Sequence, residues 1–188
     1  MYDISHKKCL IFDLDGTLAA TERANALAYI HAFSDMGVEI TEEEYEQYFG
    51  LGTPELIKEL APDMTEQEAL NLRKLKTEYY KKTFQSIKLN RPLIQLLKSA
   101  MHTHSIGLAT MGSKKNAMSL LDHFGLTDYF DYIVTRDDVE KAKPDPECFL
   151  KVATHLGAMP EDCLVFEDST FGIEAAVNAD MDYIKIEM

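Results

Sequence analysis

The chain has 188 residues, of which 46% are hydrophobic, and this predicts one domain with a packed core or one domain carrying a sizeable insertion. The 32 acidic and 19 basic side chains give a formal net charge of −13, which argues against a nucleic acid or an anionic membrane as a partner. We find no apolar run of the ~18 residues that a membrane span needs, and Met1–Lys8 lacks the apolar segment of a signal peptide.

The three cysteines, Cys9, Cys148 and Cys163, stand far apart and form no Cys-x-x-Cys motif. Such a sparse, odd-numbered set is typical of reduced thiols in the cytosol. We therefore expect a soluble cytoplasmic protein whose cysteines act as small buried hydrophobes.

The first predicted element is a buried strand over the apolar run Cys9–Phe12, followed directly by Asp13-Leu14-Asp15-Gly16-Thr17. Carboxylates at positions i and i+2 of a strand end repel and raise each other's pKa, a cost that a divalent cation would remove. An acidic turn that merely leaves the strand is the alternative. An EF-hand loop fits poorly, because its glycine belongs at the sixth position and here the glycine is the fourth residue.

Residues from about Ala20 to Ser86 predict helices and no convincing strand. Small and apolar residues recur at helical spacing between Ala26 and Gly37. Capping boxes at Thr41–Glu44 and Thr65–Glu68 predict two helix starts, the second helix running to about Phe84, and Pro54 suits the first turn of another.

From Leu89 onward the pattern alternates between helix and strand. Helices are predicted over 92–101, 113–124, 146–156 and 171–178, and strands over 105–110, 132–134, 163–166 and 183–186. Near-continuous apolar strands in this alternation predict an α/β fold, a Rossmann-like parallel sheet covered by helices on both faces. The first strand belongs to this sheet, so we expect a core of residues 1–18 and 88–188 and a small all-helical cap over residues 19–87.

Active sites in such sheets lie at the carboxyl ends of the strands. The second of these strand ends is Thr110-Met111-Gly112, before a helix, where unpaired amides and the helix dipole suit a phosphate oxygen. The alternative is that Ser113 simply caps that helix.

Two further segments belong to the same predicted edge. Glu167 and Asp168 follow another strand and, with Asp13 and Asp15, suit a hard cation such as Mg²⁺, or else they cap the next helix. Lys143, in a Lys-Pro-Asp-Pro loop, could neutralise a phosphoryl oxygen, or it is an ordinary surface lysine.

These four segments together resemble the motifs of the haloacid dehalogenase superfamily of phosphotransferases. The resemblance covers essentially the whole chain, and the helical insertion fits the small cap of that family. The chain is most similar to the β-phosphoglucomutase and sugar-phosphate phosphatase branch, and the stretch from Gly125 to Ala176 is similar to bacterial fructose-1-phosphatase-like members.

The resemblance implies a role for each motif residue. Asp13 would be the nucleophile that forms an aspartyl-phosphate, and Asp15 would be the general acid and base. Mg²⁺ would be held by Asp13, the backbone carbonyl of Asp15 and Asp168, with Glu167 holding metal-bound water. The phosphoryl site would consist of Thr110, the amides of Met111 and Gly112, and Lys143.

The chain departs from the family pattern where the substrate would be selected. Ala20 stands where an aspartate is frequent, Asn25 stands where relatives of this branch carry a histidine, and segment 50–54 lacks the arginine with which the mutases grip a second phosphate. Lys76, in a Lys-x-x-x-Tyr setting like that of the mutases, is the expected cap contact, with Asn25, Gly52 and Thr53 as further specificity residues. A solvated helix lysine is the alternative for Lys76.

The predicted function is a Mg²⁺-dependent phosphatase of a small phosphorylated metabolite, with a sugar phosphate expected. A phosphosugar mutase that uses the same aspartyl-phosphate is the alternative. A non-catalytic binding protein on this scaffold is a third hypothesis, and the presence of both Asp13 and Asp15 argues against it. We expect a monomer or a weak homodimer.

Overall fold

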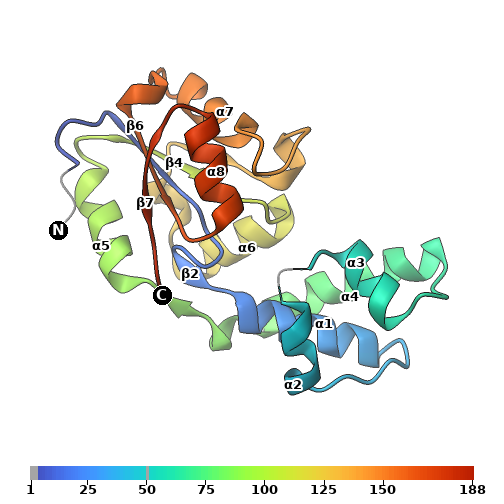
Figure 1. Ribbon diagram of the computed structural model, residues 1–188. Helices are drawn as coiled ribbons and strands as arrows, with labels where there is room; N and C mark the ends of the chain where they lie inside the picture. Colours follow the sequence, from blue (N-terminus) through green and yellow to red (C-terminus); the bar gives the residue numbers. More distant parts are fainter. Residues whose placement is uncertain (1–3, 50) are drawn as a thin grey trace. The chain divides into compact units, whose positions relative to one another are not determined.

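The computed structural model describes residues 4–49 and 51–188 (Figure 1). The chain divides into two compact units, one formed by the segment up to Ala20 together with Lys88–Met188 and the other by Thr21–Ile87. We call the first unit the core and the second the cap.

The core contains a five-stranded sheet in its described part, with the strand order β5-β4-β1-β6-β7. The strands are β1 (Cys9–Phe12), β4 (Ser105–Ala109), β5 (Tyr132–Val134), β6 (Cys163–Glu167) and β7 (Asp182–Lys185), and all neighbouring pairs are parallel. Strand β1 lies at the centre, in register with β4 on one side and β6 on the other. The α/β fold class is therefore confirmed.

Four long helices connect these strands: α5 (Arg91–Ala100), α6 (Lys114–Phe124), α7 (Glu147–His155) and α8 (Thr170–Asn178). Helices α5 and α6 lead from β1 toward β5, whereas α7 and α8 lead back toward β7. Because parallel crossovers are right-handed, the two pairs cover opposite faces of the sheet. Short 3₁₀ turns also occur in the core at Thr127–Tyr129, Arg136–Asp138 and Pro160–Asp162.

Buried side chains cover both faces of β1, whose four residues are fully buried. Cys9 and Ile11 pack with Phe149 and Val152 of α7 in one buried cluster. Phe12 points to the other face by strand alternation and stacks on Phe166 of β6, with ring centroids 4.6 Å apart. This packing fixes the position of β1. It therefore also fixes the backbone of Asp13, the residue that follows the strand.

The cap consists of α1 (Glu22–Ser34), α2 (Glu42–Tyr45), a 3₁₀ turn (Glu46–Tyr48), α3 (Thr53–Leu60), α4 (Glu66–Lys82) and a second 3₁₀ turn (Phe84–Ser86). Its buried residues include Phe33, Tyr45, Leu56 and Leu72, contributed by all four helices. Both predicted capping boxes are present. The Thr41 and Thr65 side chains accept from the amides of Glu44 and Glu68, and the carboxylates of these glutamates accept from the threonine amides.

A pair of very short strands was not predicted from the sequence. Strand β2 (Ala19–Ala20) pairs antiparallel with β3 (Lys88–Leu89), which places residues 19 and 20 in the core, whereas the cap was expected to begin at residue 19. Two-residue strands are too short to show an alternation of apolar and polar residues, so the sequence pattern cannot reveal them.

Within the described residues, no helix has the length and hydropathy to cross a membrane.

Candidate active site

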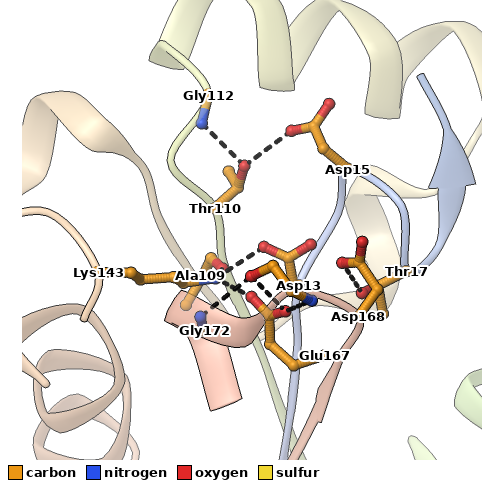
Figure 2. Close-up of polar contacts among 11 residues, drawn as sticks. Asp13, Asp15, Thr17, Ala109, Thr110, Gly112, Lys143, Glu167, Asp168 and Gly172 are labelled. Carbon is orange, nitrogen blue, oxygen red and sulfur yellow. Dashed lines mark hydrogen bonds and ion pairs between the residues drawn. The ribbon is translucent and has the colours of Figure 1, made fainter. Parts of the chain in front are cut away.

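The carboxyl ends of β1, β4 and β6 bring the predicted motif residues of the core together (Figure 2). The Asp13 amide donates to the Phe166 carbonyl oxygen at 3.0 Å, and the Thr110 amide donates to the Val134 carbonyl oxygen at 3.0 Å. The backbone positions of both residues are thus fixed by the neighbouring strands.

Lys143 lies at the centre of this group and is buried, with only 5% of its side chain exposed. Its Nζ donates to Asp13 Oδ1 and Glu167 Oε1, both at 2.7 Å, and to the Ala109 carbonyl oxygen at 3.1 Å. The Phe149 ring centroid lies 4.9 Å from the same ammonium. The alternative of an ordinary surface lysine is therefore wrong.

Glu167 is held at both of its carboxylate oxygens. Oε1 accepts from Lys143, while Oε2 accepts from the Ser169 amide at 2.7 Å and the Ser169 hydroxyl at 3.0 Å. The Ser169 hydroxyl in turn accepts from the Gly172 amide, so Ser169 is the side-chain cap of α8. Glu167 therefore contacts both the Lys143 ammonium and the amide of the residue that caps α8, whereas the side-chain cap itself is Ser169.

Two glycines make room for the acidic groups. A Cβ atom on Gly172 would overlap the Glu167 carboxylate, and one on Gly16 would overlap the Asp168 carboxylate. Gly16 also has a φ of +86°, which favours glycine. Asp168 further accepts from the Thr17 hydroxyl at 3.0 Å.

Asp15 lies in a separate polar environment. Its Oδ2 accepts from the Thr110 hydroxyl at 3.1 Å, and the oxygen of that hydroxyl accepts from the Gly112 amide at 3.0 Å (Figure 2). Ser113 occupies the N-cap position of α6, as the capping alternative expects, but its side chain makes no capping bond. Met111 is half-buried and packs against the hydrophobic core.

Burial changes the proton affinity of these groups. Burial raises the pKa of Asp13 well above its ordinary value. The Lys143 ammonium opposes this shift without cancelling it, and the Glu167 and Asp15 carboxylates raise the pKa further. Burial and the Glu167 carboxylate likewise raise the pKa of Asp168. Burial disfavours the charged form of Lys143, but Asp13 and Glu167 outweigh this and raise its pKa overall, so Lys143 remains a cation.

The donor set fits a hard divalent cation. Asp13, Glu167 and Asp168 each offer a carboxylate oxygen, and these oxygens lie within 4.8 Å of one another. The Lys143 ammonium does not by itself balance three carboxylates, and an oxygen-liganded cation such as Mg²⁺ would supply the missing charge. The carboxylate of Asp15, directed at Thr110, is outside this group.

The four expected cap residues lie in one region of the cap. Lys76 Nζ donates to Asn25 Oδ1 at 2.7 Å and lies 5.1 and 4.6 Å from the ring centroids of Tyr29 and Tyr80. The Tyr29 hydroxyl shares a 2.7 Å hydrogen bond with Thr53, which follows Gly52, the N-cap residue of α3.

Lys76 itself is only 9% exposed, so the alternative of a solvated helix lysine is wrong. In segment 50–54, which contains the expected specificity residues Gly52 and Thr53, the described residues are exposed or half-buried. Gly50, the first residue of this segment, lies outside the described residues.

Comparison with known proteins identifies the family. The model of the family described as "Haloacid dehalogenase-like hydrolase" matches residues 10–186. The chain belongs to this family.

It is 31% identical over 180 residues to the fructose-1-phosphate phosphatase YqaB of Escherichia coli, covering 95% of this chain and 96% of that protein. It is 32% identical over 180 residues to a phosphorylated carbohydrates phosphatase of Thermotoga maritima, covering 94% and 83%. Among solved structures, CbbY from Rhodobacter sphaeroides in complex with phosphate superposes with a TM-score of 0.85 at 26% identity, covering 97% of this chain and 87% of that one.

Two residues that position the acidic side chains, Ser169 and Gly172, were given no role from the sequence. Neither residue is charged: Ser169 donates to the Glu167 carboxylate, and Gly172 leaves the space that this carboxylate occupies. A sequence signal exists for Ser169 alone, because serine is a preferred N-cap residue directly before a predicted helix.

We predict that Lys143→Met destabilises the protein by about 3–5 kcal/mol, because it leaves two buried carboxylates without their cation. Urea unfolding in the presence of EDTA measures this loss. The matched control is Lys141→Met, since Lys141 is exposed and pairs with Asp145 at 3.4 Å, and its loss should be within about 0.5 kcal/mol. Equal losses in the two variants would contradict the central role of the buried ammonium.

Proposed function

We propose that the protein is a Mg²⁺-dependent phosphatase that hydrolyses a small phosphorylated metabolite, a sugar phosphate, through an aspartyl-phosphate. The observation that carries this proposal is the placement of two carboxylates in different surroundings. Asp13 contacts the Lys143 ammonium, whereas Asp15 contacts the Thr110 hydroxyl. The names of the two phosphatase relatives support the substrate class.

These surroundings divide the chemistry between the two acids. Asp13 attacks phosphorus while the bond to the ester oxygen breaks, and Asp15 gives its proton to the departing alkoxide. Asp15 then takes a proton from water as the water oxygen attacks phosphorus, which releases Asp13 and inorganic phosphate. Positioning and charge neutralisation supply most of the catalysis in such phosphoryl transfers.

The phosphoryl oxygens would be bound by Lys143, the Thr110 hydroxyl and the amides of Met111 and Gly112. Lys143 is already oriented by its contacts with Asp13 and Glu167. The Gly112 amide donates to the Thr110 hydroxyl, which donates to Asp15, and both donors would exchange these bonds for bonds to the phosphoryl oxygens. Following the family resemblance, we assign Mg²⁺ to Asp13, Asp168 and the Asp15 carbonyl, with Glu167 holding its water. When bound, the ion would offset negative charge on the phosphoryl group.

A phosphosugar mutase would use the same residues and differ in its acceptor, a bound sugar phosphate in place of water. The described part of the 50–54 segment holds leucine, glycine, threonine and proline. The missing arginine in this loop favours water as the acceptor.

The proposal is tested first at the nucleophile. Asp13→Asn should lower the turnover of sugar phosphates by about a thousandfold or more, because an amide cannot form the phosphoenzyme. Asp15→Asn should also stop turnover, through loss of the proton donor. Phosphate release measures the activity, and urea unfolding shows that each variant is folded. Substantial turnover by folded Asp13→Asn would rule out the aspartyl-phosphate.

A second test concerns the metal. Hydrolysis should stop with EDTA and return with Mg²⁺, because the acidic group repels an anionic substrate when no cation is bound. Ca²⁺ should restore little activity, since its longer bonds and looser coordination misplace the phosphoryl group. Full phosphate release after exhaustive chelation would contradict the metal assignment.

A third test concerns substrate choice, which we assign to the cap residues around Lys76. Lys76→Ala should lower kcat/KM for the preferred sugar phosphate about tenfold or more, by removing a charged hydrogen-bond donor. An aryl phosphate, which depends mainly on the core residues, should lose much less. Lys82→Ala is the control, because Lys82 also lies over a tyrosine ring but is exposed. Equal losses on both substrates would contradict the assignment.

A further inference from the structure

Glu147, the first residue of α7, binds the backbone of the loop that carries Lys143. Its carboxylate accepts from the Glu140 amide at 3.1 and 3.0 Å and from the Lys141 amide at 2.9 Å. Lys151, one turn further along α7, pairs with the same carboxylate at 2.6 Å. Glu147 thus joins the start of the loop to the helix that follows it.

Other contacts fix the second half of this loop. The Asp145 amide donates to the Ala142 carbonyl oxygen at 3.0 Å, and Asn178 of α8 donates to the Pro144 carbonyl oxygen at 3.0 Å. At the N-terminal side of the loop, Glu147 binds the amides of Glu140 and Lys141, which directly precede Ala142 and Lys143. The backbone of Lys143 is therefore restrained from both directions, and Glu147 supplies the restraint on the entering side.

The helix to which Glu147 ties the loop is itself firmly packed. Val152 of α7 occupies the space that a Cβ on Gly107 of β4 would need, and Phe149 lies beneath the Lys143 ammonium. A loop joined to α7 is therefore held in a fixed position relative to the ends of β1 and β4. Hydrogen bonds from Lys151 and the two backbone amides lower the pKa of Glu147 to about 2, so its carboxylate is charged at neutral pH.

Precise placement matters because the Lys143 ammonium serves two carboxylates at once. It lies 2.7 Å from both Asp13 and Glu167, and a lysine side chain has enough freedom to lose one contact if its backbone moves. A displacement of about 1 Å in a positioned group can reduce turnover about a hundredfold.

We infer that Glu147 is a positioning residue for Lys143, acting through the Glu140 and Lys141 amides to hold the phosphoryl-binding lysine in place. This inference rests on the proposed function, in which Lys143 binds the phosphoryl group. It adds to the reaction a residue that contacts neither substrate nor metal.

A matched pair of double variants isolates the amide contacts. Glu147→Gln/Lys151→Met keeps an acceptor oxygen, and Glu147→Met/Lys151→Met removes it, while both have the same charge and similar length. We expect the methionine form to have a 10- to 100-fold lower kcat/KM than the glutamine form, in line with the loss of other supporting contacts around a site, about 10- to 100-fold. KM and the inhibition constant of inorganic phosphate should both rise, with little change in kcat, because a less firmly positioned Lys143 binds the phosphoryl group less well.

Lys151→Met alone is the further control, and it should stay within about threefold of the parent protein because the amide contacts remain. A purely structural role for Glu147 would lower the urea midpoint of the methionine form and leave KM and phosphate inhibition equal in the two forms, which would overturn the inference. Absence of turnover in the parent protein would instead contradict the proposed function. Parent turnover with equal KM in both double variants would refute the positioning role alone.

Discussion

The buried Lys143 ammonium is the contact on which the arrangement of the site depends. It joins Asp13 at the end of β1 to Glu167 at the end of β6, and it also holds the Ala109 carbonyl oxygen of β4. Asp13 and Glu167 would repel each other strongly in a dry environment without this cation. The ammonium therefore makes it possible for three neighbouring strands to end in a compact acidic centre.

Two glycines and two hydroxyl side chains further restrict the positions of the acidic side chains. Ser169 fixes the second oxygen of Glu167, Thr17 fixes Asp168, and Gly16 and Gly172 leave the space that these carboxylates occupy. None of these four residues adds charge to the site. Their role is to reduce the number of orientations that the acids can adopt, and orientation is what phosphoryl transfer requires most.

The sheet was predictable because its strands are short apolar runs with clear ends, and the core site was predictable because those ends carry charged or hydroxyl residues. The buried state of Lys143 and Lys76 was not predictable, since lysine is mostly exposed and only the tertiary partners of these two residues explain their burial. Ser169 and Gly172 were missed for a related reason: each acts through a contact that only the folded chain creates. The roles of Asp13, Asp15 and the cap residues remain predictions.

The central position of β1 has a consequence for how the protein is made. Asp13 is synthesised early, but Lys143 follows 130 residues later, and Thr17 meets Asp168 across 151 residues. The cap lies entirely within Thr21–Ile87, so all of its residues are synthesised before either neighbour of β1. Such long-range pairing slows folding and leaves an apolar strand exposed in the nascent chain. The protein thus acquires its acidic centre only after β6 emerges, and a chain released before that point would expose β1 as an unpaired, aggregation-prone strand.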